Sequence, residues 1–497
     1  MRHRRRTDHP DVAMNLKSTF RLLGLLVWVC VFGMSVAYGQ QSSYRAADCP
    51  DELDLFDFSV EVAGETYQCG ALTVPQNRQT LDGRTVSLPV LTLNATGPTD
   101  QAPIVYLSGG PGGSAIAELD YWRTSPLRMF HDIILVEQRG TALTSPNLLC
   151  PEFQEGMMLP VTACAERLRA DGVELAAYNT QENAADIHDL IVQMGLPPVN
   201  LIGISYGTRL GSAVLRDYPE VIRALVLDSV YPVQASVYDG RLSAAQRAID
   251  ALFAACYEDA ACQPAYPDLE HDFYIWLARL NSSPASYNIP FSNRDFYFDD
   301  AVLMEFLIQW LYDTRGIPSL PETLSQLIEG DYSVFDAYFG LSGDIPAGAF
   351  IPLSDGLYLS IQCQEEIPSD DIETILRGDG RVRFEVADPL RRSLRGQFAS
   401  CIEWDVPPAD PNAHQPVVSD MPVLLLSGRF DPITPPEWAE AAAATLPNSQ
   451  YVFFESGGHG MVNTLDCATA ITMRFLREPL VELDTSCAAQ KPIWSVP

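Results

Sequence analysis

Lysine is almost absent from this chain of 497 residues, with Lys17 and Lys491 its only two examples. Acidic residues outnumber Lys and Arg by 64 to 32, which leaves a formal net charge of −32. Nucleic acid and anionic membranes repel such a surface, so we expect neither as a partner. The length suits two to three domains, and 47% hydrophobic with 19% charged residues is typical of a globular protein.

Long apolar runs are also missing, apart from one stretch near the N-terminus. Residues 22–37 are apolar, but this stretch is shorter than the ~20 residues that a membrane span usually needs. Arginines precede it, and Ala37-Tyr38-Gly39 supplies small residues for cleavage. This pattern is typical of an export signal. We therefore expect residues 1–39 to be removed, and a secreted or periplasmic protein with no stable membrane anchor.

The common metal-binding patterns Cys-x-x-Cys and His-Glu-x-x-His are absent, so we predict no metal and no cofactor. Without Cys30 of the leader, ten cysteines remain. An even number in an exported chain favours disulfides, with buried free thiols as the alternative. Sequence alone does not fix their connectivity, but the simplest scheme joins sequential neighbours: Cys49 with Cys69, Cys150 with Cys164, Cys256 with Cys262, Cys363 with Cys401, and Cys467 with Cys487.

Short apolar runs alternate with helical patterns, which predicts an α/β fold with a mostly parallel sheet. The predicted strands are 104–107, 133–136, 199–204, 224–227, 423–426 and 451–454, and helices are expected at 182–194 and 208–217. The alternation stops after residue 227 and resumes at 423. That gap is too long for a loop, so it predicts an inserted domain.

The predicted insertion has mainly helical patterns, at 243–257, 273–280, 299–312 and 321–329. Its many aromatic residues suggest a small helical core that also walls a substrate pocket: Phe273, Tyr274, Trp276, Phe296, Phe298, Trp310 and Tyr312. We therefore divide the chain into a signal peptide (1–39), the N-terminal part of an α/β core (40–235), a helical cap (236–415) and the C-terminal part of the core (416–497).

A nucleophile is predicted at Ser205, in Gly203-Ile204-Ser205-Tyr206-Gly207. The Gly-x-Ser-x-Gly pattern alone is weak, but here it lies between a predicted strand and a predicted helix, as a nucleophile elbow requires. Glycines allow the close backbone approach of such a sharp turn. Serine needs a base, and the base needs an acid that orients it.

His459 is the histidine best placed to be that base, because it lies in a glycine-rich loop directly after the predicted strand 451–454. Asp431 has the matching position after the strand 423–426. The order Ser, Asp, His is the one that α/β-hydrolases use. Asp228, at the end of the strand 224–227, is the rival candidate for the acid.

A second glycine-rich loop, residues 108–114, follows the strand 104–107. Its backbone N–H groups could stabilise the oxyanion of a tetrahedral intermediate. The predicted donors are the N–H of Tyr206 and one from Gly109 or Gly110. A dinucleotide-binding fingerprint is the competing interpretation, but Pro111 removes an N–H from the loop that would hold the pyrophosphate.

Together these segments resemble the proline iminopeptidase and tripeptidyl aminopeptidase group of α/β-hydrolases. The matching segments are Gly109-Gly110-Pro111-Gly112-Gly113, Glu137-Gln138-Arg139-Gly140-Thr141, Gly203-Ile204-Ser205-Tyr206-Gly207-Thr208, Gly428-Arg429-Phe430-Asp431-Pro432-Ile433-Thr434 and Gly457-Gly458-His459-Gly460. Members often have His where this chain has Ser108, and Asp where it has Glu137. The first departure weakens any inference about fine substrate preference.

The resemblance implies a serine hydrolase that cleaves amide bonds near the free N-terminus of peptides, through an acyl-enzyme on Ser205. Such an enzyme must hold the substrate ammonium, and Glu365 and Glu366, close to the end of the predicted cap, are the candidates for this role. Two alternatives stay open. A carboxylesterase would use the same three residues, and a binding protein could retain them without activity.

Overall fold

A nine-stranded mixed sheet organises the computed structural model, which describes residues 42–56, 60–98, 100–154, 160–291, 294–339, 351–367, 371–378 and 380–496. The predicted signal peptide lies outside these residues. The strand order is β1-β2-β3-β5-β4-β6-β7-β10-β11. From β5 to β11 all neighbouring strands are parallel, and the three pairs at the other edge are antiparallel.

The parallel strands are those that the apolar runs predict. They are β4 (Ile104–Leu107), β5 (Ile133–Val136), β6 (Val199–Ile204), β7 (Ile222–Asp228), β10 (Val423–Gly428) and β11 (Ser449–Phe454). Alternate residues of these strands join two separate apolar clusters, one on each face of the sheet. Every residue of β4, β5, β6 and β10 is buried, which explains why these strands are predominantly apolar rather than alternating in sequence.

The prediction missed the three antiparallel strands β1 (Ser43–Ala46), β2 (Tyr67–Pro75) and β3 (Thr85–Leu93). Buried and half-buried residues alternate along most of β3, and Pro89 interrupts its sequence. A search for continuous apolar runs does not detect a strand of this kind, because an antiparallel strand can keep one face polar.

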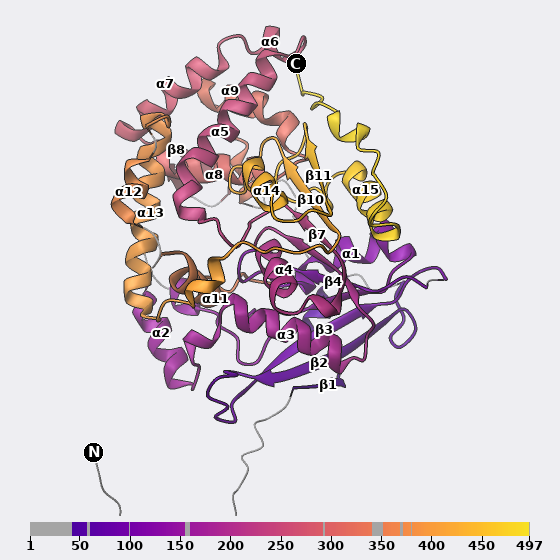
Figure 1. Ribbon diagram of the computed structural model, residues 1–497. Helices are drawn as coiled ribbons and strands as arrows, with labels where there is room; N and C mark the ends of the chain where they lie inside the picture. The colour runs from indigo at the N-terminus through magenta and orange to yellow at the C-terminus, as the bar shows by residue number, and fades with distance from the viewer. Residues whose placement is uncertain are drawn as a thin grey trace, which may run out of the picture. The chain divides into compact units, whose positions relative to one another are not determined.

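Helices cover both faces of the sheet (Figure 1). One apolar cluster includes residues of α2 (Val161–Ala170), α3 (Thr180–Gln193), α4 (Tyr206–Asp217) and α14 (Pro436–Ala443). The other includes residues of α1 (Leu119–Thr124) and α15 (Asp466–Arg477). The expected helices at 182–194 and 208–217 correspond to α3 and α4.

A helical cap separates β7 from β10, which confirms an α/β fold with a large insertion. Its helices lie together in the upper left of Figure 1: α5 (Val237–Tyr257), α7 (Leu269–Ser282), α8 (Asp300–Tyr312), α9 (Leu320–Glu329), α12 (Ile372–Arg377) and α13 (Phe384–Trp404). Shorter elements are α6 (Cys262–Ala265), α10 (Phe335–Tyr338), α11 (Asp355–Ile361) and the hairpin of β8 (Ala285–Ile289) and β9 (Arg294–Phe298). The exact limits of the cap, 236 and 415, stay a prediction.

Two local features explain the differences from the expected helices. Helix α5 begins six residues before the expected 243, because the Ser236 hydroxyl accepts hydrogen bonds from the first-turn amides of Tyr238 and Asp239. Helix α13 has Pro389 in its interior and was not predicted. The aromatic residues of the cap do form an apolar core, in which Phe273, Trp276 and Phe298 are buried.

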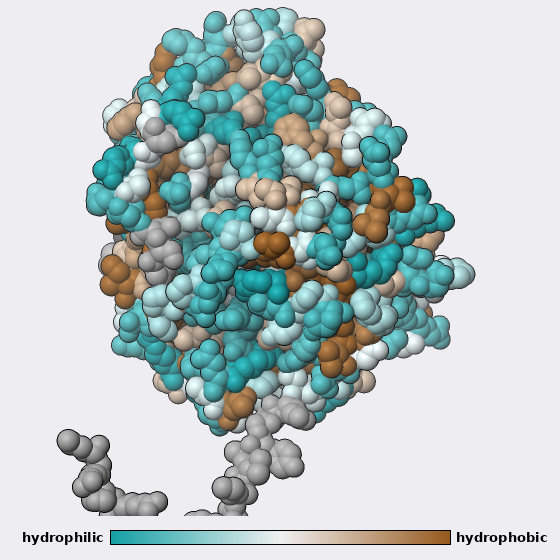
Figure 2. All heavy atoms as spheres, viewed as in Figure 1, coloured by the Kyte–Doolittle hydropathy of each residue, from teal (hydrophilic) through white to brown (hydrophobic). Residues whose placement is uncertain are grey.

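All five predicted disulfides are present, each between sequential neighbours. On the face in Figure 2, brown hydrophobic side chains form small separate groups among teal hydrophilic ones. Within the described ranges, none of the helices has both the length and the apolar character that crossing a membrane requires.

Candidate active site

Ser205 lies at the sharp turn between β6 and α4. Its φ of 57° is in the left-handed region, which is strained for a residue other than glycine. The flanking glycines permit the turn. A Cβ on Gly203 would lie 2.2 Å from the Gly207 carbonyl oxygen, and one on Gly207 would lie 2.0 Å from the Leu107 carbonyl oxygen. The elbow that the sequence predicts is therefore formed.

The glycine-rich loop after β4 packs directly against this serine. A Cβ on Gly109 would lie 3.1 Å from the Cβ of Ser205, so a side chain there would crowd the nucleophile. Within the described part of the chain, the backbone N–H groups of Tyr206, Gly109 and Gly110 have no acceptor. These three groups, predicted as oxyanion donors, are thus available to a ligand beside Ser205.

Asp431 and His459 form a buried pair, with His459 Nδ1 2.8 Å from Asp431 Oδ2. The other carboxylate oxygen accepts from the backbone amides of Ile433 and Thr434, at 3.0 and 2.9 Å. Burial alone would raise the pKa of Asp431, but the charge and hydrogen bond of His459 and the Thr434 hydroxyl lower it. The carboxylate is therefore held in its charged form beside the imidazole.

His459 Nε2 is buried and has no hydrogen-bond partner among the described residues. We call residues 457–462, which carry this histidine, the base loop. The cap fixes the first part of this loop: His459 N donates to the Tyr312 carbonyl at 3.0 Å, and Gly458 N donates to the Thr314 hydroxyl at 2.9 Å. The Tyr312 ring also packs on the imidazole, with 4.3 Å between ring centroids.

The rival acid Asp228 lies at the end of β7, between β6 and β10. Its carboxylate accepts a hydrogen bond from the backbone amide of Val462, with 2.7 Å between N and Oδ2. No hydrogen bond joins it to the His459 ring within the described residues. The geometry thus favours Asp431 over Asp228 as the partner of the imidazole.

Glu365 and Glu366 lie in a π-helical turn that continues α11, and both are only 2% exposed. Glu365 accepts from the backbone amide and the hydroxyl of Thr180, at 2.6 and 2.7 Å, and its Oε2 lies 3.4 Å from Arg209 Nε. Glu366 Oε1 lies 2.9 Å from Arg209 Nη2, but no well-directed hydrogen bond reaches this oxygen. Arg209 therefore compensates part of the charge of both glutamates.

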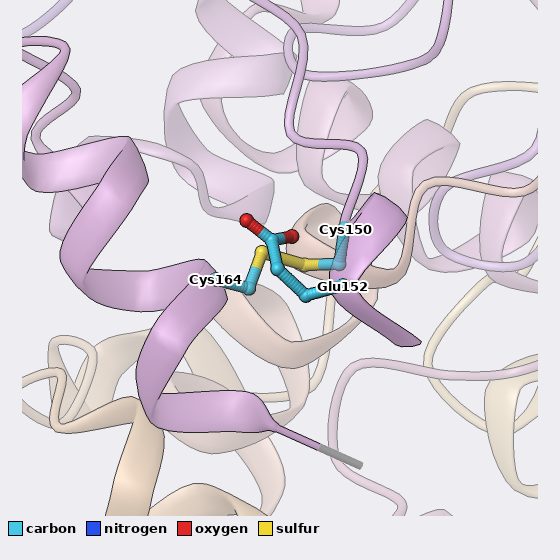
Figure 3. A group of neighbouring side chains, drawn as sticks. All are labelled: Cys150, Glu152 and Cys164. Carbon is cyan, nitrogen blue, oxygen red and sulfur yellow. A yellow bond between two sulfur atoms is a disulfide. The ribbon is translucent and has the colours of Figure 1, made fainter. Parts of the chain in front are cut away.

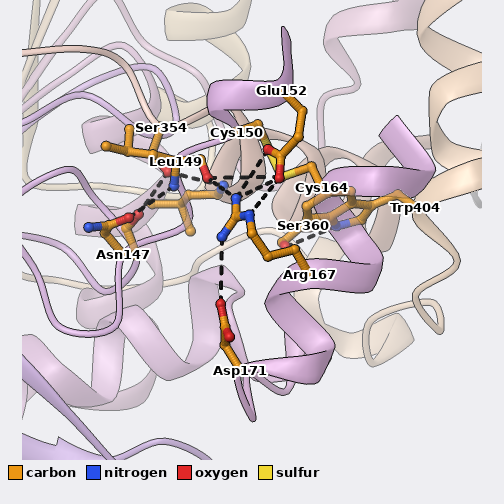
Figure 4. Close-up of a disulfide and its surroundings, with 12 residues drawn as sticks. Asn147, Leu149, Cys150, Glu152, Cys164, Arg167, Asp171, Ser354, Ser360 and Trp404 are labelled. Carbon is orange, nitrogen blue, oxygen red and sulfur yellow. Dashed lines mark hydrogen bonds and ion pairs between the residues drawn. A yellow bond between two sulfur atoms is a disulfide. The ribbon is translucent and has the colours of Figure 1, made fainter. Parts of the chain in front are cut away.

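One group of potential metal ligands occurs in the ranges that the structure describes, and it consists of Cys150, Glu152 and Cys164 (Figure 3). Their ligand atoms all lie within 4.8 Å of one another, close enough to share an ion. Both sulfur atoms belong to a disulfide, so neither is a thiolate ligand. Figure 4 shows the Arg167 guanidinium beside Glu152, with 2.5 Å between Nε and Oε1. The group is thus a disulfide beside an ion pair.

Several residues that hold the predicted catalytic loops were not predicted from the sequence. Arg247 on α5 donates to the carbonyl of Arg429, at 2.7 Å, and to that of Asp431. Tyr312 and Thr314 at the end of α8 hold the base loop. Arg209 could have been found from its spacing, since it lies one turn after Ser205 on the buried helix α4. The cap residues carry no signal in the sequence, because only folding brings them to the core.

Two family models match the chain: residues 102–254 match the alpha/beta hydrolase fold, and residues 390–487 match the family described as TAP-like protein. The serine protease Hip1 of Mycobacterium tuberculosis is 26% identical over 412 residues, which cover 74% of this chain and 76% of the relative. A tripeptidyl aminopeptidase of Streptomyces lividans is 26% identical over 446 residues, or 80% and 79% of the two chains. A solved proline iminopeptidase-related protein of Thermus thermophilus is 17% identical, with a TM-score of 0.38, and the match covers 83% of this chain and 98% of that one.

Proposed function

Because this chain belongs to the α/β-hydrolases and its C-terminal part matches the TAP-like family, we propose that it is an exported serine aminopeptidase that cleaves amide bonds near the free N-terminus of peptides. One observation carries the proposal. The strained Ser205 faces a glycine loop with free N–H groups, and the buried Asp431–His459 pair leaves the Nε2 nitrogen of the histidine without a partner. The five disulfides agree with a location outside the cytoplasm.

In the proposed reaction, Ser205 Oγ attacks the carbonyl carbon while His459 Nε2 takes the hydroxyl proton. Charge then develops on the carbonyl oxygen, where the N–H groups of Tyr206 and of Gly109 or Gly110 can stabilise it. When the C–N bond breaks, the imidazolium gives its proton to the leaving amine. Water hydrolyses the acyl-enzyme by the same proton transfers in reverse order. Throughout, Asp431 orients the imidazole and stabilises its charged form.

The recognition of a substrate ammonium is the finer part of the proposal, and the contacts distinguish the two candidate glutamates. Glu365 already accepts from Thr180, and it lines a cavity of about 390 Å³ together with Arg209 and Arg216, while Ser205 is not among the residues that line this cavity. We therefore assign Glu365 to fixing the cap on the core. Glu366 is the better candidate for the ammonium.

Three observations support Glu366 in this role. Its Oε1 has no well-directed hydrogen bond. Both glutamates pair with the same guanidinium, that of Arg209, so in the described residues Glu366 has no ion-pair partner of its own. The charge of Glu366 also acts on the buried hydroxyls of Tyr231 and Tyr238. Burial is the main cause that raises the pKa of both tyrosines, and the charge of Glu366 raises them further, so both hydroxyls stay neutral. An ammonium is the cation that would complete this cluster.

The test of the function begins with a fluorophosphonate probe, which should label the wild-type protein and fail to label Ser205→Ala at any concentration. A panel of peptidyl aminomethylcoumarins with one, two or three residues then compares free with acetylated N-termini, beside p-nitrophenyl esters. We expect hydrolysis of free-amine amides, with kcat/KM at least tenfold above that of acetylated forms. Efficient ester hydrolysis without amide hydrolysis would favour a carboxylesterase instead, and an absence of labelling would contradict any serine hydrolase.

The same panel tests the glutamates individually. In Glu366→Gln, we expect KM for free-amine substrates to rise and the preference over acetylated forms to narrow by about tenfold, which corresponds to about 1.4 kcal/mol of binding energy. The matched variant Glu365→Gln should lose thermal stability and keep the preference. If both variants retain the preference of the wild type, a different group holds the ammonium.

A further inference from the structure

The second half of the base loop is hydrogen-bonded to Asp228, the last residue of β7, and to Ser229, which follows it. Gly460 N donates to the hydroxyl of Ser229 at 2.8 Å. Val462 N donates to the carboxylate of Asp228, with 2.7 Å between N and Oδ2. Four backbone N–H groups of the base loop, those of residues 458, 459, 460 and 462, therefore donate to atoms outside it.

The backbones of Asp228 and Ser229 contact the other predicted catalytic segments. The Asp228 carbonyl accepts from the backbone N–H of Ser205 at 3.0 Å, and Ser229 N donates to the Leu426 carbonyl on β10, also at 3.0 Å. Ser229 has a φ of 60°, which is strained for serine. A strained conformation persists where surrounding contacts impose it, and here these contacts are the nucleophile turn, β10 and the base loop.

Asp228 is fully buried, and burial raises its pKa to about 6, although the backbone amides of Met461 and Val462 and the charge of His459 favour the charged form. Asp431 disfavours the charge of Asp228, and the charge of Asp228 in turn raises the pKa of Tyr106 on β4 and of Tyr121 on α1. The charges of Asp228 and His459 interact, so a negative charge on Asp228 stabilises the imidazolium that forms during proton transfer. Asp228 can thus act on the base through its loop and through its charge.

We propose that Asp228 is a positioning residue, which as a carboxylate holds the base loop and keeps the His459 imidazole in reach of Ser205. The inference rests on the proposed function, since it needs His459 as the base. Displacement of a catalytic group by about 1 Å can cost about 100-fold in rate. The neutral carboxylic acid has one oxygen fewer to accept hydrogen bonds, and it loses its attraction for the imidazolium.

The experiment measures the second-order rate of fluorophosphonate labelling between pH 4.5 and 9, because this reaction needs the serine and the base but no particular peptide. We expect Asp228→Asn to label about tenfold more slowly than the wild type at pH 8. We also expect the pH profile of its labelling rate to lack one ionisation near pH 6, on the acidic side, since asparagine cannot be charged. The wild type should therefore lose rate more steeply below pH 6 than the variant does.

Thermal stability separates positioning from a purely structural role. A carboxyl with a raised pKa binds more protons in the folded than in the unfolded protein between about pH 4 and pH 6, so its contribution to stability falls as pH rises through this window. Asp228→Asn removes that contribution, and we expect its Tm at pH 8 to equal or exceed that of the wild type. A slower enzyme with an undiminished Tm is the expected combination.

The matched control is Asp300→Asn, which removes a carboxylate that is also buried but pairs with Arg392 in the cap. It should change stability and leave the pH profile of labelling unchanged.

If Asp228→Asn fails to fold, Ser229→Ala supplies the test, and we expect a several-fold slower labelling rate with the ionisation near pH 6 retained. The proposal would be overturned by a wild-type labelling rate in Asp228→Asn or Ser229→Ala, by an ionisation near pH 6 that persists in Asp228→Asn, or by a loss of rate in Asp228→Asn as large as in Asp431→Asn. No labelling of the wild type would instead contradict the proposed function itself.

Discussion

At the scale of single residues, two aspartates compete for the role of the acid, and their partners differ. Asp431 accepts from the imidazole, whereas Asp228 accepts from backbone amides. We expect Asp431→Asn to lower kcat by about 1,000- to 10,000-fold with an unchanged fold, because an amide orients the imidazole in the wrong tautomer. Asp228→Asn should cost about tenfold. Steady-state kinetics of both variants on one substrate decides the assignment, and the reverse order of effects would contradict it.

The sequence points to Ser205, Asp431 and His459 because each follows a recognisable strand and lies among glycines or before proline, and their catalytic roles stay a prediction. It offers no basis for distinguishing the two glutamates. Nothing in the sequence places Arg209 between Glu365 and Glu366, and a carboxylate that is paired inside the protein has the same sequence signal as one that faces a substrate. Partners distant in the chain become visible only when the fold brings them together.

At the scale of elements, the buried parallel strands were predictable and the antiparallel ones were not. Strands β4 to β7 are predominantly apolar because both faces of the sheet are covered, whereas β3 alternates and contains a proline. Helix α13 was missed for a related reason, since Pro389 and Gly396 weaken its helical pattern. Packing against the cap core stabilises this helix despite its poor local propensity.

Two cap helices bind the loops that carry the predicted acid and base: α5 contacts the loop of Asp431, and the end of α8 contacts the loop of His459. Arg247 on α5 is largely buried, and its guanidinium donates to two carbonyls of the loop that carries Asp431. We expect Arg247→Met to lower the free energy of unfolding by about 1.5–3 kcal/mol, as for lost hydrogen bonds to a charged group, and to lower kcat more than it raises KM.

Chemical denaturation and steady-state kinetics of Arg247→Met measure the two effects. Arg383→Met is the control, because it removes a guanidinium from an exposed ion pair with Glu270, at another place on the cap. Surface pairs contribute little to stability, and we expect a change below about 1 kcal/mol and normal kcat. If Arg247→Met were fully active, the cap would not support the acid loop.

At the scale of the whole molecule, the disulfides are distributed over core and cap and close loops of very different length. Cys363 and Cys401 are separated by 38 residues, and Cys256 and Cys262 by 6. In the chain-entropy description, closing the longer loop stabilises the folded state by about 4 kcal/mol and closing the shorter one by about 2 kcal/mol. Paired Cys→Ala variants should therefore lose stability in that order.

The Cys363–Cys401 disulfide also joins the π-helical turn that carries Glu365 and Glu366 to helix α13. Its loss should loosen the turn, so we expect the preference for free N-termini to narrow in the Cys363→Ala/Cys401→Ala variant, while fluorophosphonate labelling at Ser205 continues. The Cys256→Ala/Cys262→Ala variant lies elsewhere in the cap and should keep the preference. Denaturant midpoints and the peptide panel measure both variants. Equal preference for free N-termini in the two variants would argue against a role of the π-helical turn, and so of Glu365 and Glu366, in substrate recognition.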